Sequence, residues 1–346
     1  MKTTEDIGRR VRDQRLAGGL TQGELADRAQ VSRALVGALE HGRHMPAADA
    51  AIRLAQALGS SVEQLFGAEP DEPSLAATAV LDGRVPDGAL VRAAWVGDAA
   101  VVRVVDPENA LTIGACADGV MVGDRIRMFA RAAPRGAVIA GCDPVLGLAE
   151  GLLERAGEAR VVGVPATSGQ ALAALEAGRC HGALVHGPAR SLEARPGLRR
   201  WHVARWRSGV ATHPRLSRPS LDALLGGEVP VVQRDRSAAC QQAVERATRR
   251  LGAPRPKALR TARGHLDAAR AALEHRSGAV TIEPVAVAMG MDFLELELHD
   301  VELWVPDRWL AQPGIRAFLD LLSAPGFRER AGALPAYDLT DTGAAR

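Results

Sequence analysis

Lysine, aromatic residues and cysteine are scarce in this 346-residue chain, and long apolar runs are absent. Only Lys2 and Lys257 are lysines among the 43 basic residues, a bias that we attribute to a GC-rich genome rather than to chemistry. Five Trp, five Phe and one Tyr make up the aromatics, in a composition otherwise ordinary for a globular protein. The length allows two or three domains.

The few cysteines form no CxxC pair, and in a chain of this size they are expected to be reduced thiols rather than a disulfide framework. They are Cys116, Cys142, Cys180 and Cys240. The N-terminus has no apolar signal core, and no apolar run approaches the length of a membrane span. We therefore expect a cytoplasmic protein without a membrane partner.

Charge of one sign is also missing. The formal net charge is +2, and the first seventy residues balance nine Lys and Arg against nine Asp and Glu. Any basic footprint for nucleic acid must therefore be local. No Walker-type loop, HExxH, GxSxG or GxGxxG sequence occurs, so we predict no cofactor, no resident metal and no catalytic residue.

Start and stop signals predict five short helices in the first seventy residues. Thr21 and Glu24 have the spacing of a capping box. The other expected helix starts are Thr4, Ser32, Pro46 and Ser61, and the fifth helix is expected to end at Leu65-Phe66.

The string GLTQGELADRAQVSRALVGALEHGRHMP, followed by ALGSSVEQLF, resembles the Cro/phage-repressor (Xre-like) helix-turn-helix over about a fifth of the chain. The resemblance implies that the second helix of the motif enters the major groove of a double-stranded DNA operator. It also implies a homodimer that reads two half-sites about one helical turn apart.

Residues matching the family's base-facing positions are Ser32, Arg33, Ala34, Gly37 and Ala38, and those placed for phosphate contact are Gln22, His41, Arg43 and His44. Only Arg33 has a long hydrogen-bonding side chain, and bidentate contact with guanine contributes about 1–3 kcal/mol of discrimination. We therefore expect modest direct readout, with DNA shape or a second half-site supplying the rest.

Arg15 and Glu40 match a family ion pair between the first and third helices. Arg15 as a surface phosphate ligand is the alternative, but Glu40 would then repel the DNA backbone beside it. The alternative for the whole motif is a five-helix protein-interaction module.

An acidic, Pro-containing stretch, Gly67–Ser74, predicts a domain boundary. We place the helix-turn-helix domain at 1–68, a linker at 69–84 and an α/β effector domain at 85–346, with a small β subregion at about 88–125. From Gly136 onward, short apolar strands alternate with helices, which predicts a mostly parallel sheet that binds ligands at its carboxyl edge.

The segments AVIAGCDPVLGLAEGLL, HGALVHGP, VPVVQRDRSAACQQA and MGMDFLELELHDVELWVP resemble the periplasmic-binding-protein-like domain of molybdate-type binding proteins, over about two thirds of the chain. The resemblance implies two lobes joined by a hinge that close on a ligand. The full fold class is thus an all-α five-helix domain followed by a two-lobed α/β domain.

Candidate ligand-binding residues follow from the turns after the strands. They are Cys142, Asp143, Thr167, Ser168, His186, Arg236, Ser237 and Glu283. Each has a structural alternative, such as a helix cap for Ser168 and Ser237 or a dipole partner for Asp143. An oxyanion is implied by the resemblance, whereas Asp143 and Glu283 favour a small organic, amine-bearing effector.

Four further features need an interpretation. Cys180-His181 with His186 is either a metal or thiol sensor or ordinary core. Cys142, near a helix N-terminus, is a candidate redox thiol with a depressed pKa. The Arg/Trp stretch 199–207 is either a nucleic-acid surface or a solvated strand edge, and the basic stretch 246–263 is an exposed helix and loop.

The sequence thus predicts a one-component regulator in which a small molecule alters DNA binding. The alternatives are an enzyme with an autoregulatory DNA-binding domain and an antitoxin-like interaction module, which the size of the second domain disfavours.

Overall fold

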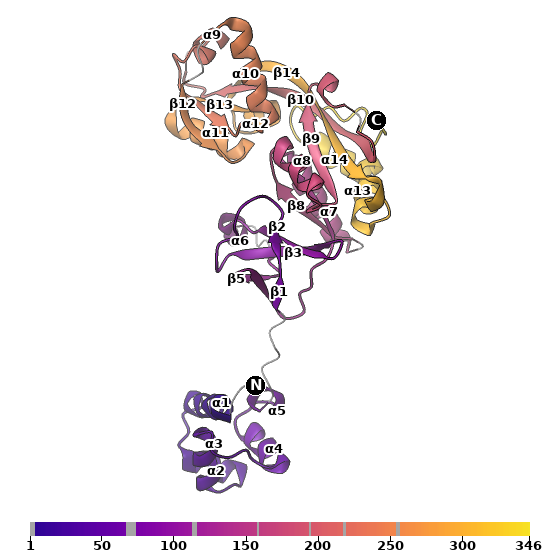
Figure 1. The fold of residues 1–346 in the computed structure, drawn as a ribbon. Coiled ribbons are helices and arrows are strands. Elements are labelled where there is room, and N and C mark those ends of the chain that lie inside the picture. The colour runs from indigo at the N-terminus through magenta and orange to yellow at the C-terminus, as the bar shows by residue number, and fades with distance from the viewer. Residues whose placement is uncertain are drawn as a thin grey trace. The chain divides into compact units, whose positions relative to one another are not determined.

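The computed structural model describes residues 4–66, 74–112, 116–157, 159–193, 195–216, 219–253 and 257–346. The chain divides into two compact units, Met1–Ser74 and Leu75–Arg346 (Figure 1). Of the predicted boundary Gly67–Ser74, all but Ser74 lies outside the described residues. The predicted linker 69–84 is not wholly irregular, because strands occupy Ser74–Ala76 and Thr78–Ala79.

The first unit is helical. Its helices are α1 (Thr4–Ala17), α2 (Gln22–Ala29), α3 (Arg33–Glu40), α4 (Ala48–Ala57) and the single turn α5 (Val62–Leu65). The capping box of Thr21 and Glu24 is present, and the Ser32 side chain accepts a hydrogen bond from Leu35 N. α4 is capped at Ala47, so Pro46 precedes its first turn instead of occupying it.

A small core holds the first unit together. Val11, Leu25, Val36, Leu39 and Leu54 are all fully buried in it. They come from four different helices and recur at helical spacing, so each helix buries one apolar stripe. This packing presents the opposite face of α3 to solvent.

The second unit begins with a six-stranded sheet in the order β1-β6-β5-β3-β4-β2. Its strands are β1 (Ser74–Ala76), β2 (Thr78–Ala79), β3 (Leu90–Val96), β4 (Ala99–Val104), β5 (Gly119–Val122) and β6 (Arg125–Met128), with α6 (Pro107–Thr112) between β4 and β5. The predicted strands at 90–96, 100–105 and about 119–122 are present, and the sheet extends beyond the predicted 88–125.

An eight-stranded sheet follows, in the order β12-β11-β13-β10-β14-β9-β7-β8. Its first lobe contains β7 (Ala137–Gly141), α7 (Pro144–Ala156), β8 (Val161–Pro165), α8 (Ser168–Glu176), β9 (Gly182–Gly187), α13 (Pro313–Ser323) and α14 (Pro325–Gly332). Its second lobe contains α9 (Leu221–Leu225), β11 (Val231–Arg234), α10 (Ala239–Leu251), β12 (Ala258–Ala262), α11 (His265–His275), β13 (Gly278–Ile282) and α12 (Glu283–Ala288).

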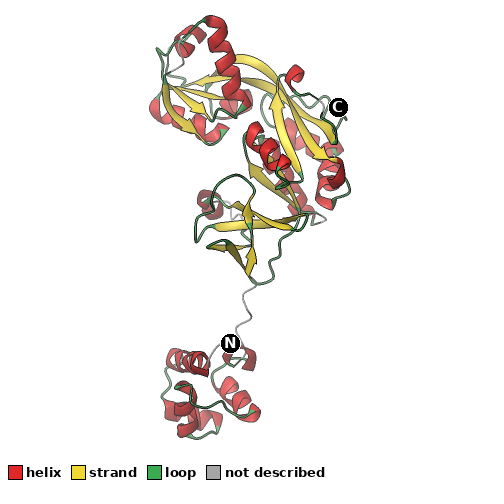
Figure 2. Cartoon of the chain, viewed as in Figure 1, coloured by secondary structure: helices red, strands yellow, loops and turns green. Residues whose placement is uncertain are grey.

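Two long strands, β10 (Leu198–Thr212) and β14 (Asp292–Pro306), connect the lobes. Figure 2 shows them running between the two groups of helices. β10 pairs antiparallel with β13 in the second lobe, and β14 pairs antiparallel with β9 in the first. The sheet is therefore parallel within each lobe but antiparallel through its centre, so the predicted parallel sheet is correct only lobe by lobe.

The apolar run of strand β7 is unbroken because both faces of the strand are buried. Ala137 and Ile139 enter one core of the unit, whereas Val138 and Ala140 enter another that includes residues of the six-stranded sheet. A strand buried on both faces has no polar alternation. Its carboxyl end, at Gly141, therefore delivers the next residues to the interior of the unit.

None of the helices in the described ranges combines the length and apolar character that a bilayer crossing requires.

Candidate functional site

The N-terminal half of α3 is open to solvent. Ser32, Arg33 and Ala34 are exposed, and Gly37 and Ala38 are half-buried. Arg33 has no hydrogen-bond or ion-pair partner within the described ranges. A guanidinium without an internal partner at this position is available to a base edge or a phosphate.

The residues expected to contact phosphate differ in whether their side chains already bind another part of the protein. Arg43 and His44 are exposed. His41 is exposed too, but its Nδ1 donates to Gly37 O at 2.7 Å and so caps α3. Gln22 donates through Nε2 to Glu40 Oε2 at 2.9 Å, which ties its amide to the protein interior.

Arg15 and Glu40 form the predicted internal ion pair. Arg15 Nε and Nη2 donate to the two carboxylate oxygens of Glu40 at 2.6 and 2.9 Å, and Nη1 donates to Leu20 O at 2.7 Å. Both side chains are buried. The pair fixes α1 against α3 and so sets the orientation of the exposed face of α3.

In the second unit, a cluster of side chains lies where the two lobes meet, buried except for the half-buried Cys142. Cys142, which follows β7, has its Sγ 3.2 Å from Nε2 of His186 on β9. His186 Nδ1 lies 3.0 Å from Nδ1 of His299 on the connecting strand β14. The other members are Cys240 on α10 and His265 at the start of α11. We call these five residues the histidine–cysteine cluster.

Burial favours the neutral form of each side chain in the cluster. Burial raises the pKa of Cys142 to about 12 and that of Cys240 to about 11. Burial also lowers the pKa of His186 and His265 well below the ordinary value. The expectation that a helix N-terminus depresses the Cys142 pKa is therefore wrong, because α7 is capped by Asp143 and the thiol is desolvated.

Asp143 is committed to internal hydrogen bonds. It accepts from Val145 N and Trp206 Nε1, both at 2.8 Å, and from the Tyr337 hydroxyl at 3.1 Å. Burial raises its pKa, although these hydrogen bonds oppose the shift. The Trp206 ring lies 4.7 Å from the His186 ring, so Asp143 positions the indole that covers the cluster.

Thr167 and Ser237 join the lobes directly, with their hydroxyl oxygens 2.6 Å apart. Thr167 also caps α8, whereas α10 is capped at Ala238, so Ser237 is not the cap. Ser168 Oγ accepts from His186 N at 3.1 Å. Of the candidate ligand-binding residues, the structure thus brings together Cys142, Asp143, Thr167, Ser168, His186 and Ser237.

Arg236 and Glu283 are not part of this group. Arg236 is exposed, and Glu283 forms an ion pair with Arg207 at 3.0 Å. Arg234, two residues earlier, is buried instead, and its Nη1 lies 2.8 Å from His265 Nδ1. Sequence reasoning missed Arg234, Cys240, His265 and His299; the one signal available was that Arg234 ends an apolar strand.

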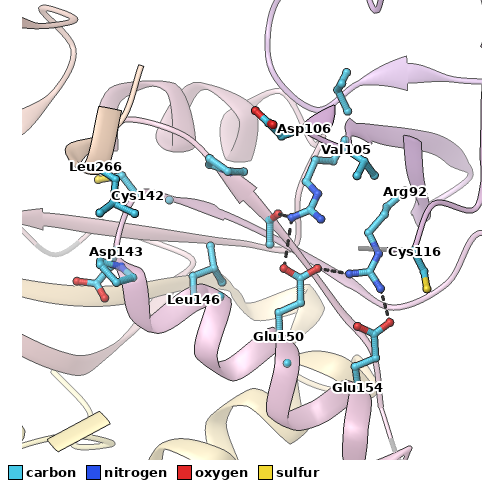
Figure 3. Close-up of a pocket in the computed structure, with 18 of the residues that line it drawn as sticks. Arg92, Val105, Asp106, Cys116, Cys142, Asp143, Leu146, Glu150, Glu154 and Leu266 are labelled. Carbon is cyan, nitrogen blue, oxygen red and sulfur yellow. Dashed lines mark hydrogen bonds and ion pairs between the residues drawn. The ribbon is translucent and has the colours of Figure 1, made fainter. Parts of the chain in front are cut away.

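A cavity of about 640 Å³ leads to Cys142. Figure 3 shows Cys142, Asp143 and Leu266 at one side of it and the paired charges Arg92, Glu150 and Glu154 at the other. Arg92 Nη1 donates to Glu150 at 2.6 Å, and Arg103 lies 3.3 Å from the same carboxylate. These charges are paired with one another, whereas the side chains of Cys142, Asp106 and Arg155, which also line the cavity, form no ion pair among the described residues.

The structure also shows where the residues of the remaining sequence hypotheses lie. Cys180 packs in the apolar core, and His181 Nδ1 accepts from Val138 N. Among the described residues, no group with metal-ligand spacing includes either. Stretch 199–207 lies in β10 and pairs with β14 on one side, whereas β13 pairs only with Ser208–Thr212. Its other side is a strand edge that meets the C-terminal segment at two isolated bridges, Trp201 with Ala345 and Arg205 with Asp338. In stretch 246–263, Arg246 is paired with Glu297, and β12 replaces part of the expected loop.

Family comparisons match both units. Residues 11–65 match the model described as "Helix-turn-helix", and residues 149–323 match the "PBP superfamily domain". An uncharacterized HTH-type transcriptional regulator from Methanothermobacter thermautotrophicus is 44% identical over 62 residues, which is 18% of this chain and 90% of that protein.

Two solved structures are also similar. The restriction-modification controller protein C.AhdI from Aeromonas hydrophila shares 33% identity over 18% of this chain and 96% of its own, with a TM-score of 0.18. The bromide-bound regulatory domain of HypT from Salmonella typhimurium shares 12% identity over 57% of this chain and 95% of its own, with a TM-score of 0.44.

Proposed function

Because the chain belongs to the PBP superfamily and carries an Xre-type helix-turn-helix domain before it, we propose that it is a transcription regulator whose DNA affinity changes when a small ligand binds between the lobes. The observation that carries the proposal is the exposed N-terminal half of α3, where Arg33 has no partner within the described ranges. Because the proposed regulator must reach its DNA operator, the proposal also places the protein in the cytoplasm.

On DNA, Ser32, Arg33 and Ala34 would face bases and Arg43 and His44 would face phosphates. Each helix-turn-helix domain has one long side chain, Arg33, at a base-facing position. This supports a homodimer, since two domains on half-sites about 34–36 Å apart double the number of base contacts. The five-helix organisation, with α5 as its single last turn, belongs to the same proposal.

The ligand would occupy the region of the histidine–cysteine cluster. Thr167 of the first lobe and Ser237 of the second meet there, so a ligand that contacts both lobes changes their separation. The amine-bearing effector loses its support, because Asp143 accepts three hydrogen bonds and Glu283 is paired with Arg207. For the oxyanion alternative, Arg234 remains as a buried positive charge.

A binding role fits the cluster better than a catalytic one. A nucleophilic cysteine acts as its thiolate, whereas burial holds the pKa of Cys142 at about 12. Its partner His186, with a pKa well below the ordinary value, does not hold the proton that a thiolate–imidazolium pair requires.

A mobility-shift titration of the full chain against its own promoter region tests the proposal. We expect a specific complex at moderate salt that survives competition by unrelated DNA. Absence of a specific shift across the whole upstream region contradicts it. Native mass spectrometry of freshly purified protein then identifies a co-purified ligand by its mass.

A further inference from the structure

We propose that the histidine–cysteine cluster is a binding site for a single thiophilic metal ion, Zn²⁺ or Cu⁺, held by Cys142, His186 and His265. Ligand atoms of these three residues all lie within 4.8 Å of one another. Thiolate and imidazole are the ligands that both ions prefer. That the ion is the regulator's ligand rests on the proposed function. That the ion binds at this site does not.

His186 is prepared for coordination by a chain of hydrogen bonds. Arg246 donates to both carboxylate oxygens of Glu297 at 2.8 and 2.6 Å. Burial raises the pKa of Glu297, but hydrogen bonds from Arg246 and His299 outweigh it and hold the pKa at about 2. The ionised carboxylate can only accept, so His299 donates to it through Nε2 at 3.1 Å.

The tautomers of both histidines follow from that carboxylate. A neutral His299 with its proton on Nε2 accepts at Nδ1, so His186 donates to it from Nδ1. His186 Nε2 therefore presents a lone pair to Cys142 Sγ, 3.2 Å away. A carboxylate that fixes the tautomer of a ligating histidine is a recurrent feature of metal sites.

The same chain of hydrogen bonds decides between two possible triads of metal ligands. Cys240, His186 and His299 also lie within 4.8 Å of one another. That triad would use His186 Nδ1, which already donates to His299. The Cys142 triad uses Nε2, which is not needed to hold the ring in place.

His265 adds a ligand from the second lobe. It is buried, and its Nε2 has no hydrogen-bond partner among the described residues. Ligand atoms on one Zn²⁺ lie at most about 4.4 Å apart, given bond lengths of about 2.0 Å to nitrogen and 2.3 Å to sulfur. The present separation of at most 4.8 Å is close to this limit, so coordination would tie His265 of the second lobe to Cys142 and His186 of the first.

Arg234 competes with the ion for His265. Because a guanidinium only donates, His265 Nδ1 accepts from Arg234 Nη1 at 2.8 Å and Nε2 carries the ring proton. Coordination through either nitrogen breaks this hydrogen bond: at Nδ1 the ion replaces Arg234, and at Nε2 the proton moves to Nδ1. Cys142 gives its thiol proton to solvent, so one proton leaves for each ion bound.

The test is a titration of the reduced full chain, without oxygen, with Zn²⁺ or Cu⁺ against a chromophoric chelator. We expect one ion per chain with at least one of the two ions, and the two titrations distinguish them. Cys142→Ser and His186→Gln should each weaken binding by about 100-fold or more. Cys116→Ser, a thiol outside the cluster, should leave the affinity unchanged.

Arg234→Met separates a metal from an anion. It should tighten metal binding about 10-fold or more, since the competing guanidinium is gone. An anionic ligand requires the opposite, loss of binding in this variant. Tryptophan fluorescence confirms that the second unit of each variant is folded, because all five tryptophans (Trp95, Trp201, Trp206, Trp304 and Trp309) lie there.

Failure of either ion to bind, or equal affinity in wild type, Cys142→Ser and His186→Gln, overturns the metal site. Since these titrations contain no DNA, such a failure leaves operator binding intact. Conversely, a metal site with the expected variants but no specific promoter complex overturns the regulator proposal alone.

Discussion

Arg15 and Glu40 are joined by two hydrogen bonds of 2.6 and 2.9 Å although they are 25 residues apart. Their side chains are only 9% and 2% exposed, so removing either one leaves a buried charge without a partner. Such a loss costs about 3–5 kcal/mol, more than the pair itself contributes over apolar residues.

We therefore expect Glu40→Ala to destabilise the first unit by about 3 kcal/mol. Denaturant unfolding of the full chain measures this loss. The first unit has no tryptophan, so its unfolding changes helical circular dichroism without changing tryptophan fluorescence. Asp49→Ala, which removes an exposed ion pair with Arg53, is the control and should cost less than about 1 kcal/mol. Equal losses in the two variants contradict the prediction.

Acid should weaken the same unit. Burial raises the pKa of Glu40, but hydrogen bonds from Arg15 and Gln22 outweigh it, and the net pKa is lowered. A lowered folded-state pKa gives stability that is present above the ordinary value of about 4.3 and is lost as pH falls through the folded value. Circular dichroism melts between neutral pH and pH ~3 should show this loss in wild type and much less of it in Glu40→Gln.

Arg33→Ala and Arg43→Ala should fail differently on DNA. Arg33 lies at a base-facing position, so its removal should relax sequence preference by about 1–3 kcal/mol. Arg43 lies at a phosphate-facing position, so its removal should weaken binding to all sequences and reduce the salt dependence by about one ion. Competition of operator against unrelated DNA at several salt concentrations distinguishes the two. A uniform loss in Arg33→Ala would remove it from direct readout.

Gly169 lets the lobes approach each other. A Cβ there would lie 2.8 Å from the Ser237 Cβ, and Gly169 N donates to Ser237 O at 3.2 Å. We expect Gly169→Ala to separate the lobes at this edge and to weaken ligand affinity about 10-fold. Gly151→Ala, whose Cβ meets no atom within 4 Å, should bind ligand like wild type. Equal binding by both variants would show that this contact does not limit closure.

Glu297 should act on metal affinity only through His299 and His186. Glu297→Leu removes the acceptor for His299 Nε2 and should weaken binding about 10–100-fold. Glu297→Gln retains an acceptor oxygen and should recover most of that loss. If Gln and Leu lower the affinity equally, Glu297 does not set the tautomers.

The first unit could be predicted from sequence because its signals are local. The capping box of Thr21 and Glu24, the Ser32 cap and the apolar stripes are each set by residues within one or two turns. A resemblance over these residues also placed the Arg15–Glu40 pair. Only the start of α4 was shifted, since proline is as acceptable just before a helix as inside its first turn.

The connecting strands could not be predicted in the same way. Stretch 199–207 is rich in arginine, which favours an exposed edge, yet β14 pairs with one side of it and the C-terminal segment bridges the other at Trp201 and Arg205. The structure satisfies these charges across strands, with Arg205 paired to Asp300 and Arg207 to Glu295. Pairing partners nearly a hundred residues away leave no local signal.

Only part of the histidine–cysteine cluster could be predicted from the sequence, for a related reason. Cys142 and His186 follow from the rule that parallel strands end at one edge. His265 and His299 reach the same place through the second lobe and through β14, and no spacing in the sequence encodes that return. Arg236 was chosen in place of Arg234 because the strand was expected to end at Val232, whereas β11 continues to Arg234.

Within the described ranges, two strands cross between the lobes, β10 and β14, and they are paired with each other over almost their whole length. Any change in the angle between the lobes must therefore be absorbed as torsion of one double-stranded ribbon. The pairing register shifts at His202/Ala204 and again at Ser208/Gly209, so the ribbon is least regular on either side of Trp206. The indole that covers the cluster thus lies between the two irregular positions of the ribbon, so the proposed function requires that filling the cluster and rotating the lobes change together.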